Sequence, residues 1–183
     1  MPTKAKMIQQ YFDTYENYKK QYGERIILLW QCGGFYEVYG LKCIKTGVLD
    51  PNIEKYGKIT DYAVKDKQVK TGNGKIPLKF NKNYTVVMAG SPISGSIEGK
   101  IKKLNENGYI VALWKQDEKI KDIREEYAVF SPGTNFICDD NISNNIMCVY
   151  LQCMKKTLLS KNPRISCGLS IIDVITGKTI YYE

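Results

Sequence analysis

Residues 26–30, IILLW, and residues 33–37, GGFYE, form the centre of the fold that this 183-residue sequence predicts. The first run has the length and the β-branched and aromatic content of a buried strand. The two glycines that follow allow the backbone to turn, to bulge or to approach another molecule closely. We therefore expect strands over about residues 25–31 and 34–40, joined by a glycine turn.

Side chains alternate between the two faces of a strand, so Phe35, Glu37 and Tyr39 share one face, whereas Tyr36 and Val38 take the other. A carboxylate two residues from a phenyl ring is costly to bury and suited to contacting a ligand. The alternative is that Phe35 belongs to the core and Glu37 is an edge charge or the partner of a lysine. The pattern alone leaves both interpretations open.

The rest of the sequence predicts a helix between each group of strands. The first helix, over residues 3–21, carries an aromatic stripe that we interpret as core packing. A second helix is expected over 51–64, and a third is expected to begin at a cap on Ser94 and to end at Asn107. Further strands are expected over 84–90, 109–115 and 123–131. This order predicts an α/β domain in which a mixed sheet is flanked by helices.

Residues 65–82 are strongly basic, with one acid, Asp66, among lysines 65, 67, 70, 75, 79 and 82. Residues 71–74, TGNG, interrupt this run, and Asn-Gly is a strong hairpin signal. The segment is either a basic hairpin that follows phosphates, with Lys65, Lys67, Lys70 and Lys75 as contacts, or an ordinary solvated insertion.

The formal net charge of +8 and the pI of about 9.0 favour an anionic partner, nucleic acid first. Only three of the 27 basic residues are arginines, which favours attraction to phosphates over reading of base edges. A lysine-rich, AT-biased genome is the alternative explanation. No apolar run approaches the length of a membrane span, and six cysteines without a Cys-x-x-Cys pair or any histidine do not indicate a zinc site. We expect an intracellular protein with reduced thiols and no membrane partner.

Several motifs, in the family's order, resemble the MutS family of DNA mismatch-repair proteins. Residues 7–11, MIQQY, precede GGFYE as a Met-x-Gln-Gln-Tyr helix precedes a Gly-Asp-Phe-Tyr-Glu strand in that family. Residues 87–92, VMAGSP, are similar to its Met-Ala-Gly-Ile-Pro segment, and 108–116 to its Gly-x-x-Val-Ala stretch. Residues 130–134, FSPGT, are similar to its Thr-Pro-Gly-Thr. The sequence departs from the family at Gly34, where aspartate is usual, in lacking the aromatic-His pair, and in the basic segment.

This resemblance implies two parts of a longer chain. Residues 1–135 correspond to the mismatch-binding domain, and residues 136–183 to the beginning of the connector domain, with strands over 146–152, 168–174 and 179–182 and an Asp-x-x-Thr-Gly turn at 173–177. The resemblance implies a longer protein, whose ATPase domain would use ATP and Mg²⁺. This part would be no enzyme and would hold no cofactor. A viral or organellar host would suit the composition.

The resemblance also implies the site and its partner. Phe35 would enter double-stranded DNA at a mispaired or unpaired base, and Glu37 would hydrogen-bond to that base. Gly33, Gly34 and Tyr36 complete the motif. The DNA would contain mismatches or small loops, would be kinked, and would be enclosed by a dimer in which one subunit makes the wedge contact.

Three other functions remain open from the sequence alone. The first is a basic DNA-binding module without mismatch selectivity. The second is a Mg²⁺-dependent nuclease built on Glu98 and Lys100, and the third is a protein-interaction module.

Overall fold

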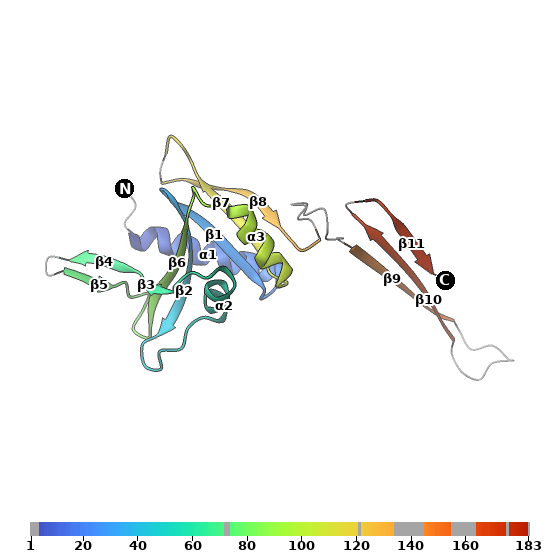
Figure 1. The fold of residues 1–183 in the computed structure, drawn as a ribbon. Coiled ribbons are helices and arrows are strands. Elements are labelled where there is room, and N and C mark those ends of the chain that lie inside the picture. Colours follow the sequence, from blue (N-terminus) through green and yellow to red (C-terminus); the bar gives the residue numbers. More distant parts are fainter. Residues whose placement is uncertain are drawn as a thin grey trace. The chain divides into compact units, whose positions relative to one another are not determined.

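The structure is a computed structural model that describes residues 4–71, 74–120, 122–133, 145–154, 164–174 and 176–182. The chain divides into two compact units, Met1–Asn135 and Phe136–Glu183, each of which is described by itself. Figure 1 labels the elements of both units.

The first unit is built on one mixed sheet with the strand order β3-β6-β2-β1-β7-β8. Only β1 and β7 run parallel, and the other neighbouring strands are antiparallel. The predicted α/β class with a mixed sheet flanked by helices is therefore confirmed. The strands of the sheet are β1 (Ile26–Cys32), β2 (Phe35–Cys43), β3 (Lys65–Asp66), β6 (Tyr84–Pro92), β7 (Ile110–Gln116) and β8 (Arg124–Phe130).

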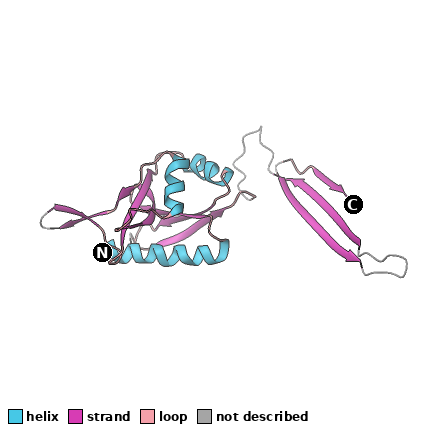
Figure 2. Cartoon of the chain, turned by 90° about the horizontal axis from the view of Figure 1, so that it is seen from below, coloured by secondary structure: helices cyan, strands magenta, loops and turns pink. Residues whose placement is uncertain are grey.

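Helices cover both faces of this sheet, with α1 on one side and α2 and α3 on the other (Figure 2). Their bounds are α1 (Lys4–Tyr22), α2 (Pro51–Thr60) and α3 (Ile97–Glu106). No helix in the described part of the chain has the length and apolar character needed to cross a membrane.

The aromatic stripe of α1 is buried against the sheet, as the sequence predicts. The ring of Tyr11 meets those of Trp30 and Tyr39 edge-on at centroid distances of 5.7 and 4.9 Å. Edge-to-face contacts of this kind add to the apolar area that the rings bury. The opposite face of β2 packs Tyr36 and Val38 under α2 and α3. The core thus holds β1 and β2 between two helical layers.

Helix ends follow the local capping chemistry. The Asp50 carboxylate accepts a hydrogen bond from the Asn52 N–H at 2.8 Å, and Pro51 begins α2. The helix ends at Thr60, four residues before the predicted end, because Asp61 adopts a left-handed conformation with φ of +60°. The predicted cap of α3 on Ser94 is wrong. β6 continues to Pro92 and a turn follows, so that Ser96 is the cap, with its Oγ accepting from the Gly99 N–H at 3.1 Å.

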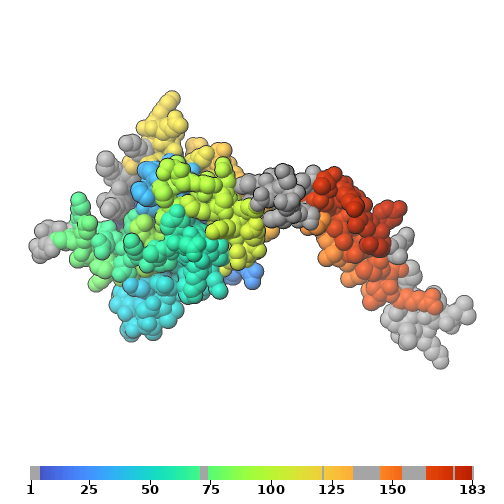
Figure 3. All heavy atoms as spheres, in the orientation of Figure 1, coloured from blue at the N-terminus to red at the C-terminus, as the bar shows by residue number. Residues whose placement is uncertain are grey.

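The basic segment forms a separate two-stranded hairpin, β4 (Gln68–Thr71) and β5 (Gly74–Pro77), which pairs Lys70 with Lys75. The hairpin follows directly on the short edge strand β3 and extends away from the sheet (Figures 1 and 3). The hairpin expected from TGNG is confirmed in its two strands, while residues 72 and 73 lie outside the described residues.

The second unit is a three-stranded antiparallel sheet in the order β11-β10-β9. Its strands are β9 (Asn145–Met154), β10 (Arg164–Asp173) and β11 (Thr179–Tyr182). The turn before β11 has the chemistry that its sequence predicts. The Thr176 hydroxyl donates to the Asp173 carboxylate at 2.8 Å, and Gly177 takes a positive φ of +70°. Residue 134, the last of the FSPGT motif, lies outside the described residues.

Candidate nucleic-acid interface

The turn between β1 and β2 is held by hydrogen bonds from both sides. The Gly33 N–H donates to the Gln116 side-chain oxygen at 2.9 Å, and the Gln116 N–H donates to the Gln31 side-chain oxygen at 3.0 Å. On the other side, the Ile93 N–H donates to the Gly34 carbonyl at 2.9 Å. These bonds to the neighbouring strands leave the turn little freedom, so the residue that follows it has a defined position.

That residue is Phe35, whose side chain is 50% exposed although it begins a central strand. It pairs with Cys32 on β1 and with Pro92 at the end of β6. The next residue, Tyr36, is buried in the opposite core, which confirms the predicted alternation of faces. Phe35 is thus not a core residue, and its phenyl ring is presented to solvent at the end of the sheet. Tyr36 anchors the beginning of β2 in the core on the other face of the sheet.

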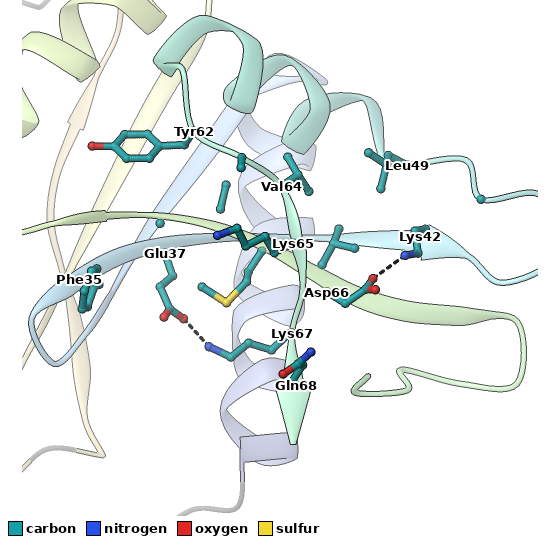
Figure 4. Close-up of a pocket in the computed structure, with 16 residues that line it drawn as sticks. Phe35, Glu37, Lys42, Leu49, Tyr62, Val64, Lys65, Asp66, Lys67 and Gln68 are labelled. Atoms are coloured by element: carbon teal, nitrogen blue, oxygen red, sulfur yellow. Dashed lines mark hydrogen bonds and ion pairs between the residues drawn. The ribbon is translucent and has the colours of Figure 1, made fainter. Parts of the chain in front are cut away.

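Glu37 follows on the same face and is not free. Its carboxylate accepts a hydrogen bond from Lys67 Nζ at 2.7 Å (Figure 4). It also accepts one from the Tyr39 hydroxyl. The Glu37 and Lys67 side chains are only 12% and 13% exposed. Burial raises the pKa of Tyr39 well above its ordinary value, so this hydroxyl stays protonated and donates. The alternative interpretation, in which Glu37 is the partner of a lysine, is therefore confirmed.

Phe35 and Glu37 line an open groove of about 990 Å³, together with residues of β3 and of the middle of β6. Lys65 and Lys67 line the same groove, so the structure brings these four predicted site residues together (Figure 4). Tyr62, which is not among the predicted site residues, also lines the groove. No pattern in the sequence marks Tyr62, because it follows α2 in a segment without periodicity.

Lys70 and Lys75 are not in this groove but on the projecting hairpin, directly opposite each other. Like charges at opposed positions of a ladder destabilise it. Both lysines are exposed, and neither makes an ion pair with any residue that the structure describes. The lone acid of the segment, Asp66, pairs instead with Lys42 at 2.5 Å. The hairpin is therefore a concentrated, uncompensated positive charge.

The residues of the nuclease alternative do not line this groove. Glu98 is in the first turn of α3, and the ammonium of Lys100 lies 5.1 Å from the centre of the Tyr62 ring. Within the described ranges, no three His, Cys, Asp or Glu side chains are grouped so as to hold a metal ion.

Similarity to a known protein adds to this description of the site and the fold. The chain is 30% identical over 177 residues to a DNA mismatch repair protein, a mutS homolog, of Acanthamoeba polyphaga mimivirus. The match covers 94% of this chain, so it runs through both units. The chain is related to the MutS family. No protein-family model matches it. The MutS-related chain spans 14% of the length of that viral relative.

The conformation of the glycine turn gives a direct test of how Phe35 is positioned. Gly33 has φ of +58°, whereas a Cβ on Gly34 would meet no atom within 4 Å and its φ is ordinary. We expect Gly33→Ala to lower the free energy of unfolding by about 1 kcal/mol relative to Gly34→Ala, because only the first forces alanine into the left-handed region. Thermal or urea unfolding of the two variants measures the difference, and equal stabilities would contradict the turn geometry.

Proposed function

We propose that this chain is the mismatched-DNA recognition module of a MutS-like mismatch-repair protein. The observation that carries the proposal is the half-exposed Phe35 ring on a turn held by hydrogen bonds, two residues before a carboxylate on the same face. The relation to a mutS homolog described as a DNA mismatch repair protein supports the same function.

Phe35 is the wedge in this proposal. A mispaired or unpaired base is poorly stacked, so inserting an apolar side chain from the minor groove costs less there than in a regular duplex. A phenyl ring stacks on any base, and such contacts are worth about 1–3 kcal/mol per base. Because Phe35 starts at a turn bonded to β7 and to Ile93, the insertion does not require the protein to order a loop first.

Glu37 supplies the polar contact. Its carboxylate accepts a hydrogen bond from a donor on the displaced base edge, which a regular duplex does not present at that position. Phe35 alone would favour any easily opened step. Phe35 and Glu37 together discriminate, because the phenyl ring stabilises an unstacked base step and the carboxylate stabilises a base that presents a hydrogen-bond donor at that position.

The lysines supply attraction that does not depend on sequence. Lys65 lies beside the wedge in the groove, and Lys70 and Lys75 extend the positive surface along the hairpin. Lysine neutralises phosphate as a point charge, and the counterions that are displaced make this binding salt-dependent. The hairpin thus brings a duplex to Phe35 without selecting its sequence.

The proposal extends to the organisation of the chain. Residues 1–135 would be the mismatch-binding domain and 136–183 the first strands of a connector domain. The chain would act by binding rather than by catalysis. The DNA would be kinked and enclosed by a dimer in which one subunit inserts its phenylalanine.

The first experiment compares binding of a duplex with one unpaired thymine and of its perfect match, by fluorescence anisotropy at low salt. We expect the wild-type chain to prefer the unpaired thymine, and Phe35→Ala to bind both duplexes equally, because the stacking is lost. Tyr127→Ala, which removes a 60% exposed aromatic ring on β8, is the matched control and keeps the preference.

Binding and cleavage of the same two duplexes separate the alternative functions. Equal binding of both duplexes by wild type and by Phe35→Ala would mean a basic DNA-binding module without mismatch selectivity. Cleavage of either duplex with Mg²⁺, lost in Glu98→Ala, would mean a nuclease. Either result would overturn the proposed function.

A second experiment tests the hairpin. The double variant Lys70→Gln/Lys75→Gln removes two phosphate contacts, so we expect the slope of log affinity against log salt to become shallower by about 2. Both duplexes should lose affinity alike, because phosphates carry no mismatch information.

The control for the hairpin is Lys20→Gln/Lys45→Gln. These exposed lysines lie near the ends of α1 and β2 that are remote from the glycine turn, and the charge removed is the same. A salt slope lowered equally in both double variants would show that only the total charge matters and would contradict the role of the hairpin.

A further inference from the structure

Lys67 joins the basic hairpin to the wedge site. It lies between β3 and β4, and its backbone is bonded on both sides. Its N–H donates to the Val86 carbonyl at 2.9 Å, and its own carbonyl accepts from the Leu78 N–H at 2.7 Å. The chain therefore holds Lys67 in place at the base of the hairpin while the lysines farther along the hairpin stay exposed.

The side chain of Lys67 contacts Glu37 and Tyr39. Nζ donates to Glu37 at 2.7 Å and lies 3.3 Å from the Tyr39 hydroxyl, and the ammonium is 5.0 Å from the centre of the Tyr39 ring. Lys65, two residues earlier, lines the same groove but makes no ion pair with Glu37 (Figure 4). Of the lysines proposed to contact DNA, Lys67 is thus distinguished by being largely buried in an ion pair.

This pairing changes what Glu37 does in the proposed function. Both donors bond to the same carboxylate oxygen, Oε2, so together they fix the orientation in which Glu37 presents its other oxygen, Oε1. The ammonium also cancels the negative charge that would repel phosphates of a regular duplex. In the protein without DNA, Glu37 is therefore held in one orientation and neutralised.

We propose that Lys67 is a specificity-determining positioning residue, which sets mismatch discrimination by controlling the charge and orientation of Glu37. This inference rests on the proposed function. When a base with a donor is presented beside Phe35, the carboxylate that Lys67 and Tyr39 hold through Oε2 accepts from that base with Oε1. On a regular duplex no such donor is presented and the Glu37–Lys67 pair stays neutral, so discrimination is weaker than an unpaired carboxylate would give.

The test is Lys67→Met, which keeps the length of the side chain and removes its charge. Without the ammonium, the charge of Glu37 is no longer neutralised, so the carboxylate repels the phosphates of a regular duplex. We expect the ratio of affinities for the unpaired-thymine and perfect duplexes to rise about fivefold, the size of effect typical of one ion pair. Lys67→Gln, which also removes the charge, should raise the ratio in the same direction.

Two controls separate this role from general charge and from folding. Lys65→Met removes the same charge from the same groove and should weaken binding of both duplexes with an unchanged ratio. Lys67→Arg keeps the ion pair and should keep the ratio near that of the wild type. Because both affinities are measured on one preparation, a variant that is partly unfolded lowers them together and leaves the ratio intact.

A double-mutant cycle completes the test. In the Glu37→Gln background, Lys67→Met should leave the ratio unchanged, since no carboxylate charge remains for Lys67 to neutralise. The role of Lys67 would be overturned if Lys67→Met and Lys67→Gln left the affinity ratio unchanged in the protein that keeps Glu37. It would also be overturned if Lys67→Met raised the ratio by the same factor in the Glu37→Gln background. If the wild type shows the preference and loses it in Phe35→Ala, such a result leaves the proposed function standing. A wild type without any preference would overturn both.

Discussion

The antiparallel pairing of β1 with β2 across the Gly33–Gly34 turn is the constraint on which the rest of the first unit depends. It buries one face of β2 under α2 and α3 and lays the other against α1. The helices cover the middle of β2 on both faces but not its first residue, so Phe35 is half exposed at the end of the sheet. The aromatic core beneath α1 and the bonds of Gln116 to the turn hold that position.

Charge is arranged around this point in two ways. On the hairpin, lysines face each other without acids, which costs stability and favours an anionic partner. At the wedge, by contrast, Lys67 and Glu37 neutralise each other in a largely buried pair. A partly buried ion pair contributes little net stability, because desolvation offsets the attraction, but losing one partner leaves an uncompensated charge. The pair is thus better suited to controlling Glu37 than to stabilising the fold.

Much of this arrangement follows from local sequence, and the exceptions have physical causes. Period-two alternation placed Phe35 and Tyr36 on the correct faces, and the Asn-Gly signal identified the hairpin. The ion pair of Glu37 with Lys67 joins residues 30 positions apart, so only the tertiary fold reveals it. The strand β3 is two residues long and too short for any periodicity. The choice of Ser96 over Ser94 as a helix cap depends on where β6 ends, which is a property of the sheet rather than of the serines.

The central claim is that Phe35 enters the DNA at the unpaired base. Replacing Phe35 with the photoreactive residue benzoylphenylalanine and irradiating the complex with a duplex that contains one unpaired thymine tests it directly. The account predicts crosslinks confined to the unpaired thymine and its stacking neighbours, and few crosslinks on the perfect duplex. Crosslinks spread evenly along both duplexes would contradict it, because the side chain would then lie against the backbone rather than in the stack.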